Sequence, residues 1–426
     1  MPPDLCRANT VTVDGETHTW ADLAERAASC LAGRVDPAAE RIAFLPDSPA
    51  GPFAAAAFLA SRQADGLILP GDRASETMRS LLAADGFTVV AGHADPVLPP
   101  TPPQVRPGRV AIFTSGTTGV PKLLQHTWGS LNTMGHIAEM APRRWLLPYA
   151  AGTYAWYQLA TLSLFKDGQH LVAADPRDTE AFFAAGAAHR ADAMSSTPTF
   201  WRFALARLDP ARLQQVGFRQ ISLGGEIVDQ GILDRLRALF PEARLNHIYA
   251  STEVGACLSV GDGQAGFPVE WVESDRHRNF QFRIVDGTLR VRSQFASASV
   301  RRDEEGWVDT GDRVEVRGDR VYFVGRVEGS MINVGGSKAY PADVERVILG
   351  HPAVQWCRVH ARRAPLVGYL AAAEVVADGD AAALEGDLTQ WCGARLPDFA
   401  VPRIWTFLEE IPMAATLKSA RMVPDG

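Results

Sequence analysis

The pattern of apolar residues changes near Trp271 and again near Pro341, and these changes limit the folds that the chain can adopt. Before about residue 250, short apolar stretches such as Arg41–Leu45 alternate with segments in which apolar residues recur at helical spacing. In one of these segments, residues 17–33, Thr19 is a suitable N-cap and Gly33 a suitable stop for a helix. Alternating strands and helices predict an α/β domain built on a largely parallel sheet.

After Trp271, short stretches of alternating polar and apolar residues follow one another, separated by Asp-Gly, Gly-Asp and Glu-Gly turns. This pattern predicts antiparallel strands. From Pro341 onward, helical and strand patterns alternate again to the C-terminus. The fold class is therefore α/β, with a large N-terminal α/β domain that carries a β-rich subdomain (residues 1–325) and a small C-terminal α+β domain (residues 326–426).

Composition excludes several classes of protein. The 426 residues are 46% apolar and 21% charged, with a net charge of −7, so a basic surface for nucleic acid is not expected. The five cysteines form no C-x-x-C pair, which favours reduced thiols in a cytoplasm. No apolar run is long enough to cross a membrane, and the N-terminus lacks a signal pattern, so we expect a cytoplasmic protein without a membrane partner.

The strand predicted at Val110–Phe113 leads directly into the sequence TSGTTGVPK, from Thr114 to Lys122. Its glycines can adopt positive φ and expose backbone N–H groups, and its hydroxyls add donors, so the loop suits a polyphosphate. In the Walker loop of nucleotide hydrolases the lysine directly follows glycine, whereas here it follows Pro121, which has no N–H. For this stretch alone, a surface turn without a ligand is the alternative interpretation.

Four further stretches follow the loop along the chain. They are YASTE (Tyr249–Glu253), WVDTGD (Trp307–Asp312), FVGRVEGSMINVGGSKAYPADVE (Phe323–Glu345) and IPMAATLKSAR (Ile411–Arg421). In this order, the five stretches resemble the ANL superfamily of AMP-forming adenylating enzymes, which includes acyl- and aryl-CoA synthetases, peptide-synthetase adenylation domains and luciferases. The resemblance covers essentially the whole chain, but the first stretch begins at residue 114, which implies a shortened N-terminal region.

The resemblance implies that a carboxylic acid attacks the α-phosphorus of ATP, giving an acyl-adenylate and pyrophosphate. Because two anions must meet, cations and oriented dipoles are needed to offset their repulsion. The phosphate loop would bind the leaving phosphates, with Lys122 as a catalytic cation. Its other predicted ATP-binding residues are Thr114, Ser115, Gly116, Thr117, Thr118 and Gly119.

The resemblance assigns the YASTE stretch to the adenine and the α-phosphate. Tyr249 would pack against adenine, Thr252 would bond the α-phosphate and Glu253 would hold Mg²⁺, with Ala250 and Ser251 also lining the ATP site. A carboxylate together with phosphate oxygens and waters is ordinary magnesium coordination. A solvated loop acid is the alternative interpretation for Glu253.

Two more groups complete the implied ATP site. Asp312 would accept hydrogen bonds from the ribose hydroxyls, as an ionised carboxylate can, with Arg326 assisting. Gly224, Gly225 and Glu226 would form the wall on the adenine side, where glycines allow backbone to approach the base and the acyl group. A plain strand-to-helix turn is the alternative for these glycines.

The resemblance implies that the small C-terminal domain moves during the reaction, and it assigns roles to several residues there. Lys418 matches the family's catalytic lysine, although Leu417 stands where the family usually has glycine. Glu328 takes the hinge position, where a residue only has to absorb a backbone rotation. Gly335 and Gly336 match the glycines that line the thiol tunnel in CoA ligases.

The aromatic residues of TYAWYQ and STPTFW are predicted to line the acid pocket together with Gly224, although core packing is an alternative for some of them. These residues are Tyr154, Trp156, Phe200 and Trp201. His126 and His247 are expected to be packed or surface imidazoles. No H-E-x-x-H and no G-x-S-x-G pattern occurs, so neither a zinc protease nor a hydrolase is favoured.

We therefore expect an AMP-forming ligase that uses ATP and Mg²⁺ to adenylate a small, aromatic carboxylic acid and passes the acyl group to CoA. Transfer to a carrier-protein phosphopantetheine or to an amine, or an unusual acid, is the alternative within the same chemistry. A non-catalytic nucleotide-binding relative is the alternative of another class. Against it, Lys122, Thr252, Glu253, Asp312 and Lys418 all carry competent side chains.

Overall fold

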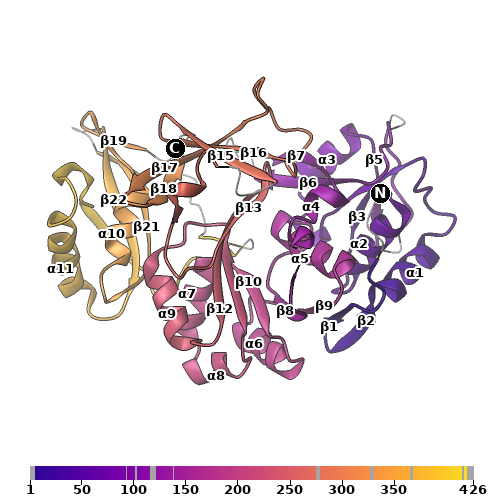
Figure 1. Ribbon diagram of the computed structural model, residues 1–426, viewed down its shortest axis with the longest axis horizontal. Helices are drawn as coiled ribbons and strands as arrows, with labels where there is room; N and C mark the ends of the chain where they lie inside the picture. Colours follow the sequence, from indigo (N-terminus) through magenta and orange to yellow (C-terminus); the bar gives the residue numbers. More distant parts are fainter. Residues whose placement is uncertain are drawn as a thin grey trace.

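A computed structural model describes residues 5–92, 94–100, 103–115, 121–137, 139–274, 279–326, 331–364, 368–414 and 417–419 of the chain. Its elements fall into two parts (Figure 1). We call elements β1 to β18 the large domain and elements β19 to β23 the small domain, which lies at the left of Figure 1. The observed mixture of α/β layers with a smaller α+β part confirms the predicted fold class.

An eight-stranded sheet forms the centre of the large domain. Its strands, in spatial order, are β13 (Gly255–Val260), β12 (Arg244–Ser251), β11 (Gln220–Gly224), β10 (Ala193–Ser196), β8 (Arg143–Leu147), β9 (Gln169–Ala173), β1 (Thr10–Val13) and β2 (Glu16–Thr19). Neighbouring strands from β12 to β1 run parallel, and the two edge strands β13 and β2 run antiparallel to their neighbours. The parallel strands bring several carboxyl ends to one edge of the sheet, which is where ligands bind in such folds.

Helices in the chain between these strands complete this layer. They are α4 (Trp128–Leu131), α5 (Tyr154–Phe165), α6 (Thr179–Ala188), α7 (Pro198–Arg207), α8 (Pro210–Gln214) and α9 (Gln230–Leu239), with 3₁₀ turns at Met134–His136 and Val269–Trp271. Helix α7 begins at Pro198 because the hydroxyl of Thr197 accepts a hydrogen bond from the N–H of Phe200, 3.1 Å away. Thr197, the capping residue, directly follows Ser196 and so lies at the carboxyl end of β10.

A second, five-stranded sheet carries the phosphate loop. Its strands, in order, are β5 (Phe87–Ala91), β3 (Arg41–Leu45), β4 (Asp65–Ile68), β6 (Arg109–Ser115) and β7 (Pro121–Thr127). Its helices are α1 (Trp20–Leu31), α2 (Gly51–Arg62) and α3 (Glu76–Ala84), with a 3₁₀ turn at Gly71–Arg73. Thr19 caps α1 in a capping box with Asp22, as the sequence predicts for this N-cap.

The residues after Trp271, together with Phe267–Pro268, form the predicted antiparallel sheet. Its strands, in order, are β14 (Phe267–Pro268), β18 (Arg320–Arg326), β17 (Val308–Arg317), β16 (Thr288–Ser293) and β15 (Phe280–Val285). The β15–β16 hairpin turns at Asp286 and Gly287, both with positive φ, which explains the Asp-Gly pair. The register of β17 against β18 shifts between Arg313 and Val314, directly after Asp312.

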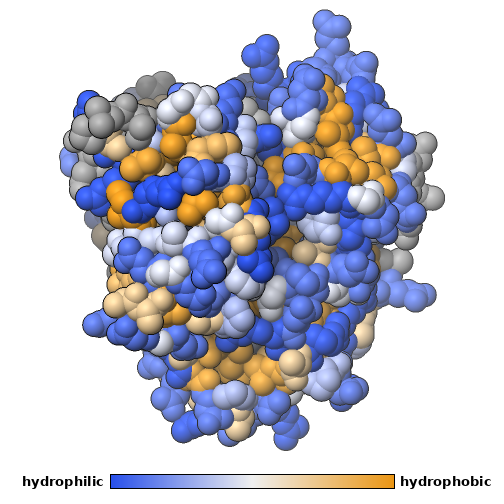
Figure 2. Space-filling model, turned by 90° about the vertical axis from the view of Figure 1, so that its left-hand side faces the viewer, coloured by the Kyte–Doolittle hydropathy of each residue, from blue (hydrophilic) through white to orange (hydrophobic). Residues whose placement is uncertain are grey.

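The small domain is a fourth sheet covered by two helices. Its strands are β20 (Ser337–Ala339), β19 (Ile332–Val334), β22 (Gly368–Ala377) and β21 (Val354–Ala364), with β23 (Ile404–Phe407) also pairing with β22. Its helices are α10 (Pro341–Leu349) and α11 (Ala381–Gly393), with a 3₁₀ turn at Asp398–Ala400. Seen from this side, the surface is largely hydrophilic, with apolar side chains gathered in separate patches (Figure 2).

Glu345 of α10 is expected to make the folding stability of the small domain depend on pH. Its Oε1 accepts a hydrogen bond from the N–H of Val359 at 2.8 Å. The pKa of Glu345 is raised from 4.5 to about 7, chiefly by burial; the charge of Glu226 acts in the same direction, whereas the Val359 N–H and the charge of Arg358 oppose it. Because the folded pKa lies above the unfolded value, the stability contributed by the protonated carboxyl is complete below pH 4.5 and is lost as the pH rises through about 7.

Glu345→Gln keeps an oxygen for Val359 but cannot ionise. Between pH 4.5 and pH 8, the free energy of unfolding of the wild type should therefore fall by about 1–3 kcal/mol relative to that of the variant. Urea unfolding at the two pH values measures this difference. Glu385→Gln, on an exposed face of α11, is the control, and its free energy of unfolding should change with pH as that of the wild type does. If the Glu345 variant and the wild type lose stability in parallel, the burial argument is wrong.

Candidate active site

Residues from four strand ends meet at the carboxyl edge of the eight-stranded sheet. Tyr149 follows β8, Thr197 follows β10, Gly225 follows β11, and Thr252 follows β12. Parallel pairing from β8 through β12 brings these ends together. The candidate site is built on this edge, with Asp312 added from the antiparallel sheet and Lys418 from the small domain.

Two side chains hold Asp312 in place at the edge of the site. The hydroxyl of Tyr249 donates to its Oδ2 at 2.6 Å, and Nε of Arg326 lies 3.3 Å from its Oδ1. The ring of Tyr249 stacks on Phe323, with centroids 4.5 Å apart. Burial raises the pKa of Asp312, while Tyr249 and Arg326 lower it. The result is a fixed carboxylate in position to accept further hydrogen bonds.

Thr252 and Glu253 are fixed through their backbone carbonyls. Nε2 of His126 lies 2.8 Å from the Thr252 carbonyl oxygen, and the N–H of Ser297 donates to the Glu253 carbonyl at 2.8 Å. Burial lowers the pKa of His126 to about 4, so this imidazole is neutral and donates from Nε2. The expectation of a packed imidazole at His126 is confirmed, but its contact with Thr252 had no signal in the sequence. The charge of Glu253 contributes to the pKa values of both His126 and Asp312, which places its side chain among the site's charges.

Two described strands flank the predicted phosphate loop. Strands β6 and β7 pair antiparallel, with Thr114 opposite Lys122 and Ser115 opposite Pro121, and Lys122 is exposed. The predicted ATP-binding residues Gly116, Thr117, Thr118 and Gly119 lie outside the described residues, as does the predicted hinge Glu328. Their roles stay predictions.

Gly225 and Lys418 are in close contact across the two domains. Gly225 has φ of +81°, and a Cβ built on it would lie 3.2 Å from Cε and 3.6 Å from Nζ of Lys418. Charges of Lys418 and Glu253 both contribute to the pKa of Asp312. The structure therefore brings Lys418 to the same site as Gly225, Glu253 and Asp312.

Glu226 connects the two domains through both of its carboxylate oxygens. Its Oε2 accepts a hydrogen bond from the N–H of Thr199 at 3.1 Å, and its Oε1 accepts one from the N–H of Ser419 at 2.8 Å. One carboxylate thus ties the first turn of α7 to the residue after Lys418. Its predicted direct role in ATP binding stays a prediction.

A wider interface holds the small domain in this orientation. Arg202 of α7 is 6% exposed, forms an ion pair with Asp229, and donates from Nη1 to the carbonyl of Gln355 at 3.1 Å. Nearby, an apolar cluster joins α7 to the small-domain strands and the segment that follows β23. It consists of Phe203, Trp356, Val376 and Ile411.

The predicted pocket aromatics prove to be deeply packed. Trp156 packs against Phe53 and Tyr157, and the rings of Phe200 and Trp201 both pack against Phe183. Trp156, Phe200 and Trp201 are at most 1% exposed, so water does not reach them. The structure does not support their role in lining the acid pocket. Tyr154, 8% exposed, lies beside Gly255 and the ring of His126.

Tyr149 is a polar group that the sequence did not assign. It lies at the end of β8, and its hydroxyl is 3.1 Å from Oγ of Ser195. Burial raises its pKa, and the charge of Glu226 acts in the same direction. The phenol therefore stays neutral and can donate or accept a hydrogen bond.

The two glycines that are predicted to line the thiol tunnel are exposed to solvent. Gly335 and Gly336 form the turn between β19 and β20, with φ of +56° and +92°, and nothing lies within 4 Å of a Cβ built on either. The N–H of Gly336 donates to Oδ1 of Asn333 at 3.0 Å. In this orientation of the small domain, Lys418 approaches the site and the glycine turn does not contact it.

The described residues offer no metal site formed by protein side chains alone. They contain no group of three or more His, Cys, Asp or Glu side chains arranged to hold a metal ion. Glu253 would thus share Mg²⁺ with phosphate oxygens and water, which is how that ion is usually held. All five cysteines are free. Within the same ranges, no helix combines the length and apolar character that crossing a bilayer requires.

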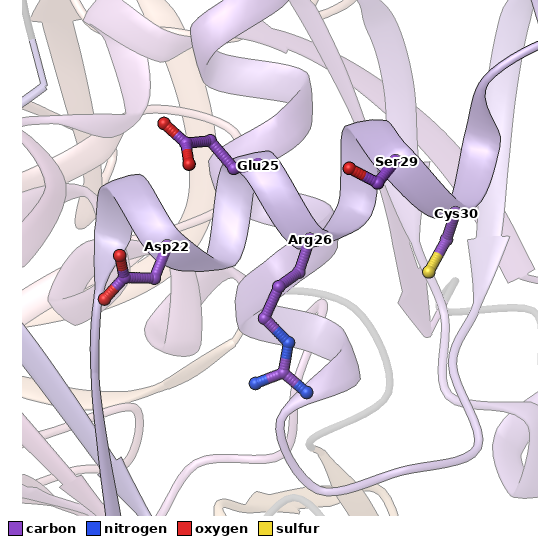
Figure 3. A pocket seen from close by; sticks show the side chains of 5 residues that line it. All are labelled: Asp22, Glu25, Arg26, Ser29 and Cys30. Atoms are coloured by element: carbon purple, nitrogen blue, oxygen red, sulfur yellow. The ribbon is translucent and has the colours of Figure 1, made fainter.

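A depression on the outer face of α1 lies far from this site, at the opposite end of the molecule from the small domain (Figure 1). Figure 3 shows its side chains following one face of the helix and pointing outward. They are Asp22, Glu25, Arg26, Ser29 and Cys30. We assign no ligand to it.

Comparison with known proteins decides the family. Residues 53–290 match the model of the AMP-binding enzyme family, and residues 343–418 match that of the AMP-binding enzyme C-terminal domain. The chain belongs to the AMP-binding enzyme family. The predicted superfamily and the predicted class, an AMP-forming ligase, are confirmed.

Curated relatives of this AMP-binding enzyme include CoA ligases. A feruloyl-CoA synthase of Amycolatopsis sp is 26% identical over 380 residues, covering 81% of this chain and 75% of the relative. A 4-chlorobenzoate–CoA ligase of Pseudomonas sp. (strain CBS-3) is 25% identical over 385 residues, covering 80% and 69%.

Solved structures share the fold. The anthranilate CoA ligase AuaEII in complex with anthranoyl-AMP has a TM-score of 0.74 at 17% identity, with 97% of this chain and 93% of that chain covered. The amide bond synthetase McbA from Marinactinospora thermotolerans has a TM-score of 0.68 at 22% identity, with 96% and 94% covered.

Proposed function

We propose that this AMP-binding enzyme activates a small aromatic carboxylic acid with ATP and transfers the acyl group to CoA. The observation that carries the proposal is the contact of Lys418 with Gly225, beside Glu253 and Asp312. These side chains come from both domains, and each suits one part of an acyl-adenylation reaction.

In the first step, an oxygen of the acid attacks the α-phosphorus of ATP. A bond forms between that oxygen and phosphorus, and the bond to the β-phosphate breaks, releasing pyrophosphate. Lys418 would offset the negative charge that the two anions bring together, with the Thr252 hydroxyl as a further donor. Lys122 and the phosphate loop would bind the departing pyrophosphate.

Asp312 would accept hydrogen bonds from the ribose hydroxyls, in the orientation that Tyr249 and Arg326 give it. Mg²⁺ would neutralise phosphate charge, held by the carboxylate of Glu253. The neutral His126 would keep the backbone of Thr252 in place.

Three related proteins support an aromatic acid, since feruloyl, chlorobenzoate and anthranilate are the acyl groups in their names. In this chain, Tyr149 would provide a neutral hydrogen-bonding group near the carboxylate end of such an acid. Of the four predicted pocket aromatics, Tyr154 stays a candidate for the pocket wall, because it is 8% exposed whereas the other three are at most 1% exposed.

In the second step, the thiol of CoA would attack the acyl carbonyl, forming a thioester as AMP leaves. We propose that the small domain first rotates about Glu328 so that Gly335 and Gly336 reach the site, and that the two domains divide at residues 325 and 326. The open space around both glycines leaves room for a thin pantetheine chain. A carrier protein or an amine is the alternative acceptor.

The acceptor is tested by supplying a panel of aromatic acids with ATP and Mg²⁺, with and without CoA, and detecting the thioester by mass spectrometry. We expect an acyl-CoA product. Adenylate formation without any thioester would instead favour a carrier protein or an amine, which can be added to the same assay.

Gly225→Ala tests the contact with Lys418. The added Cβ would lie 3.2 Å from Cε of the lysine, so adenylation should slow by about 10-fold as the lysine is displaced. Gly263→Ala is a matched control, because Gly263 has the same φ of +81° but nothing within 4 Å. The initial rate of acid-dependent pyrophosphate release measures both variants. Equal rates for the two variants would show that the contact is not used in catalysis.

A further inference from the structure

Leu417 has a backbone conformation that its side chain does not favour. Six described non-glycine residues have positive φ, and Leu417, at +62°, is the only apolar one among them. A left-handed conformation brings Cβ too close to the following carbonyl oxygen, so residues with a branched apolar side chain rarely adopt it. The resemblance to the family leads one to expect glycine here, which would adopt this conformation without cost.

The side chain of Leu417 is anchored in the large domain. It is 2% exposed and joins the apolar cluster around α6, α7 and α9, although Leu417 itself lies in the C-terminal segment of the chain. Its carbonyl accepts a hydrogen bond from the hydroxyl of Thr197, the N-cap of α7. Its N–H donates to the carbonyl of Ala414 at 2.8 Å.

Lys418 is therefore enclosed by fixed residues on both sides. Before it, Leu417 is buried in the large domain; after it, the N–H of Ser419 donates to Glu226 at 2.8 Å. The carbonyl of Lys418 accepts a hydrogen bond from Ala414 at 2.9 Å, and Met413 pairs with Ser419. Between these attachments, the lysine side chain reaches Gly225.

We propose that Leu417 is a positioning residue, whose buried side chain docks the Lys418 segment onto the large domain and so favours the orientation that adenylates. The burial of a leucine side chain offsets the unfavourable backbone. Glycine would adopt the same backbone but would leave the lysine segment without its apolar anchor. The inference rests on the proposed function, because it assigns Leu417 a role in the adenylation step.

The experiment measures the two half-reactions separately in Leu417→Ala, Leu417→Gly and Leu417→Met. Acid-dependent exchange of pyrophosphate into ATP reports the first half-reaction, and thioester formation from supplied acyl-adenylate and CoA reports the second. We expect kcat/KM of the first half-reaction to fall about 10- to 100-fold in the alanine and glycine variants, because the buried anchor is lost. The methionine variant, which conserves volume, should stay within about threefold of the wild type.

The second half-reaction should be unchanged or faster in the alanine and glycine variants, because it requires Lys418 to leave the site. Docking is also measured without catalysis, by hydrogen exchange of the Ser419 amide. We expect exchange at least about 10-fold faster in Leu417→Gly, with no change in α11.

The inference would be overturned if the Ser419 amide of Leu417→Gly exchanged at the wild-type rate. It would also be overturned if both the alanine and the glycine variant adenylated at the wild-type rate. An equal loss in both half-reactions would also overturn it, because that result indicates a general loss of folded protein. If the wild type adenylates no acid of the panel, the proposed function fails and this inference with it.

Discussion

Lys418→Ala is expected to lower the rate of adenylation by about 100-fold or more, with ATP binding and folding nearly unchanged. The lysine approaches the site from the small domain and lies against Gly225, so it contributes charge to the reacting centre rather than packing to the core. Removing one preorganised cation of this kind removes stabilisation that is present mainly in the transition state. Pyrophosphate release gives the rate, and calorimetry with ATP gives the affinity.

Lys166→Ala is the matched control for this prediction. Lys166 follows α5 and donates to the carbonyl of Ile137 at 2.9 Å, outside the residues assigned to the site. It should adenylate at the wild-type rate. Normal adenylation by Lys418→Ala would show that the lysine has been given the wrong role, whatever its position beside Gly225.

Asp312→Ala is expected to raise the KM for ATP by about 10- to 100-fold, because a half-buried carboxylate that would bind the ribose hydroxyls is lost. Tyr249→Phe should have a smaller effect in the same direction, since it removes only the 2.6 Å hydrogen bond that orients Asp312. Burial raises the pKa of Asp312, so the KM for ATP of the wild type should rise as the pH falls and this carboxyl protonates.

Asp319→Ala, in the exposed turn of the same hairpin, controls for the loss of a charge from this sheet. Its KM for ATP should equal that of the wild type. An Asp312→Ala enzyme with an unchanged KM for ATP would contradict the assignment of Asp312 to the ribose, even if its kcat were lower.

The sequence predicted the fold well because its signals are local. Thr19 caps α1, Arg41–Leu45 is β3 as expected, and the Asp286-Gly287 turn closes the β15–β16 hairpin. Each of these rests on a few neighbouring residues whose preferences tertiary packing did not override.

The site was predicted less completely because much of it depends on contacts between distant segments. The motifs identified Asp312 and Lys418, and the structure brings both to one edge of the sheet. Aromatic residues suit a pocket wall and a core equally well, so Trp156 and Phe200 could not be assigned from composition. The anchoring of Leu417 could not be predicted either, because its hydrogen-bond partner Thr197 lies 220 residues earlier in the chain.

Acid-dependent exchange of labelled pyrophosphate into ATP tests the central claim most directly, because it requires reversible formation of an acyl-adenylate and no acceptor. With Mg²⁺ present, we expect exchange with at least one small aromatic acid, none without acid, and almost none in Lys418→Ala. A wild-type enzyme that binds ATP but exchanges no pyrophosphate with any acid of the panel would contradict the account.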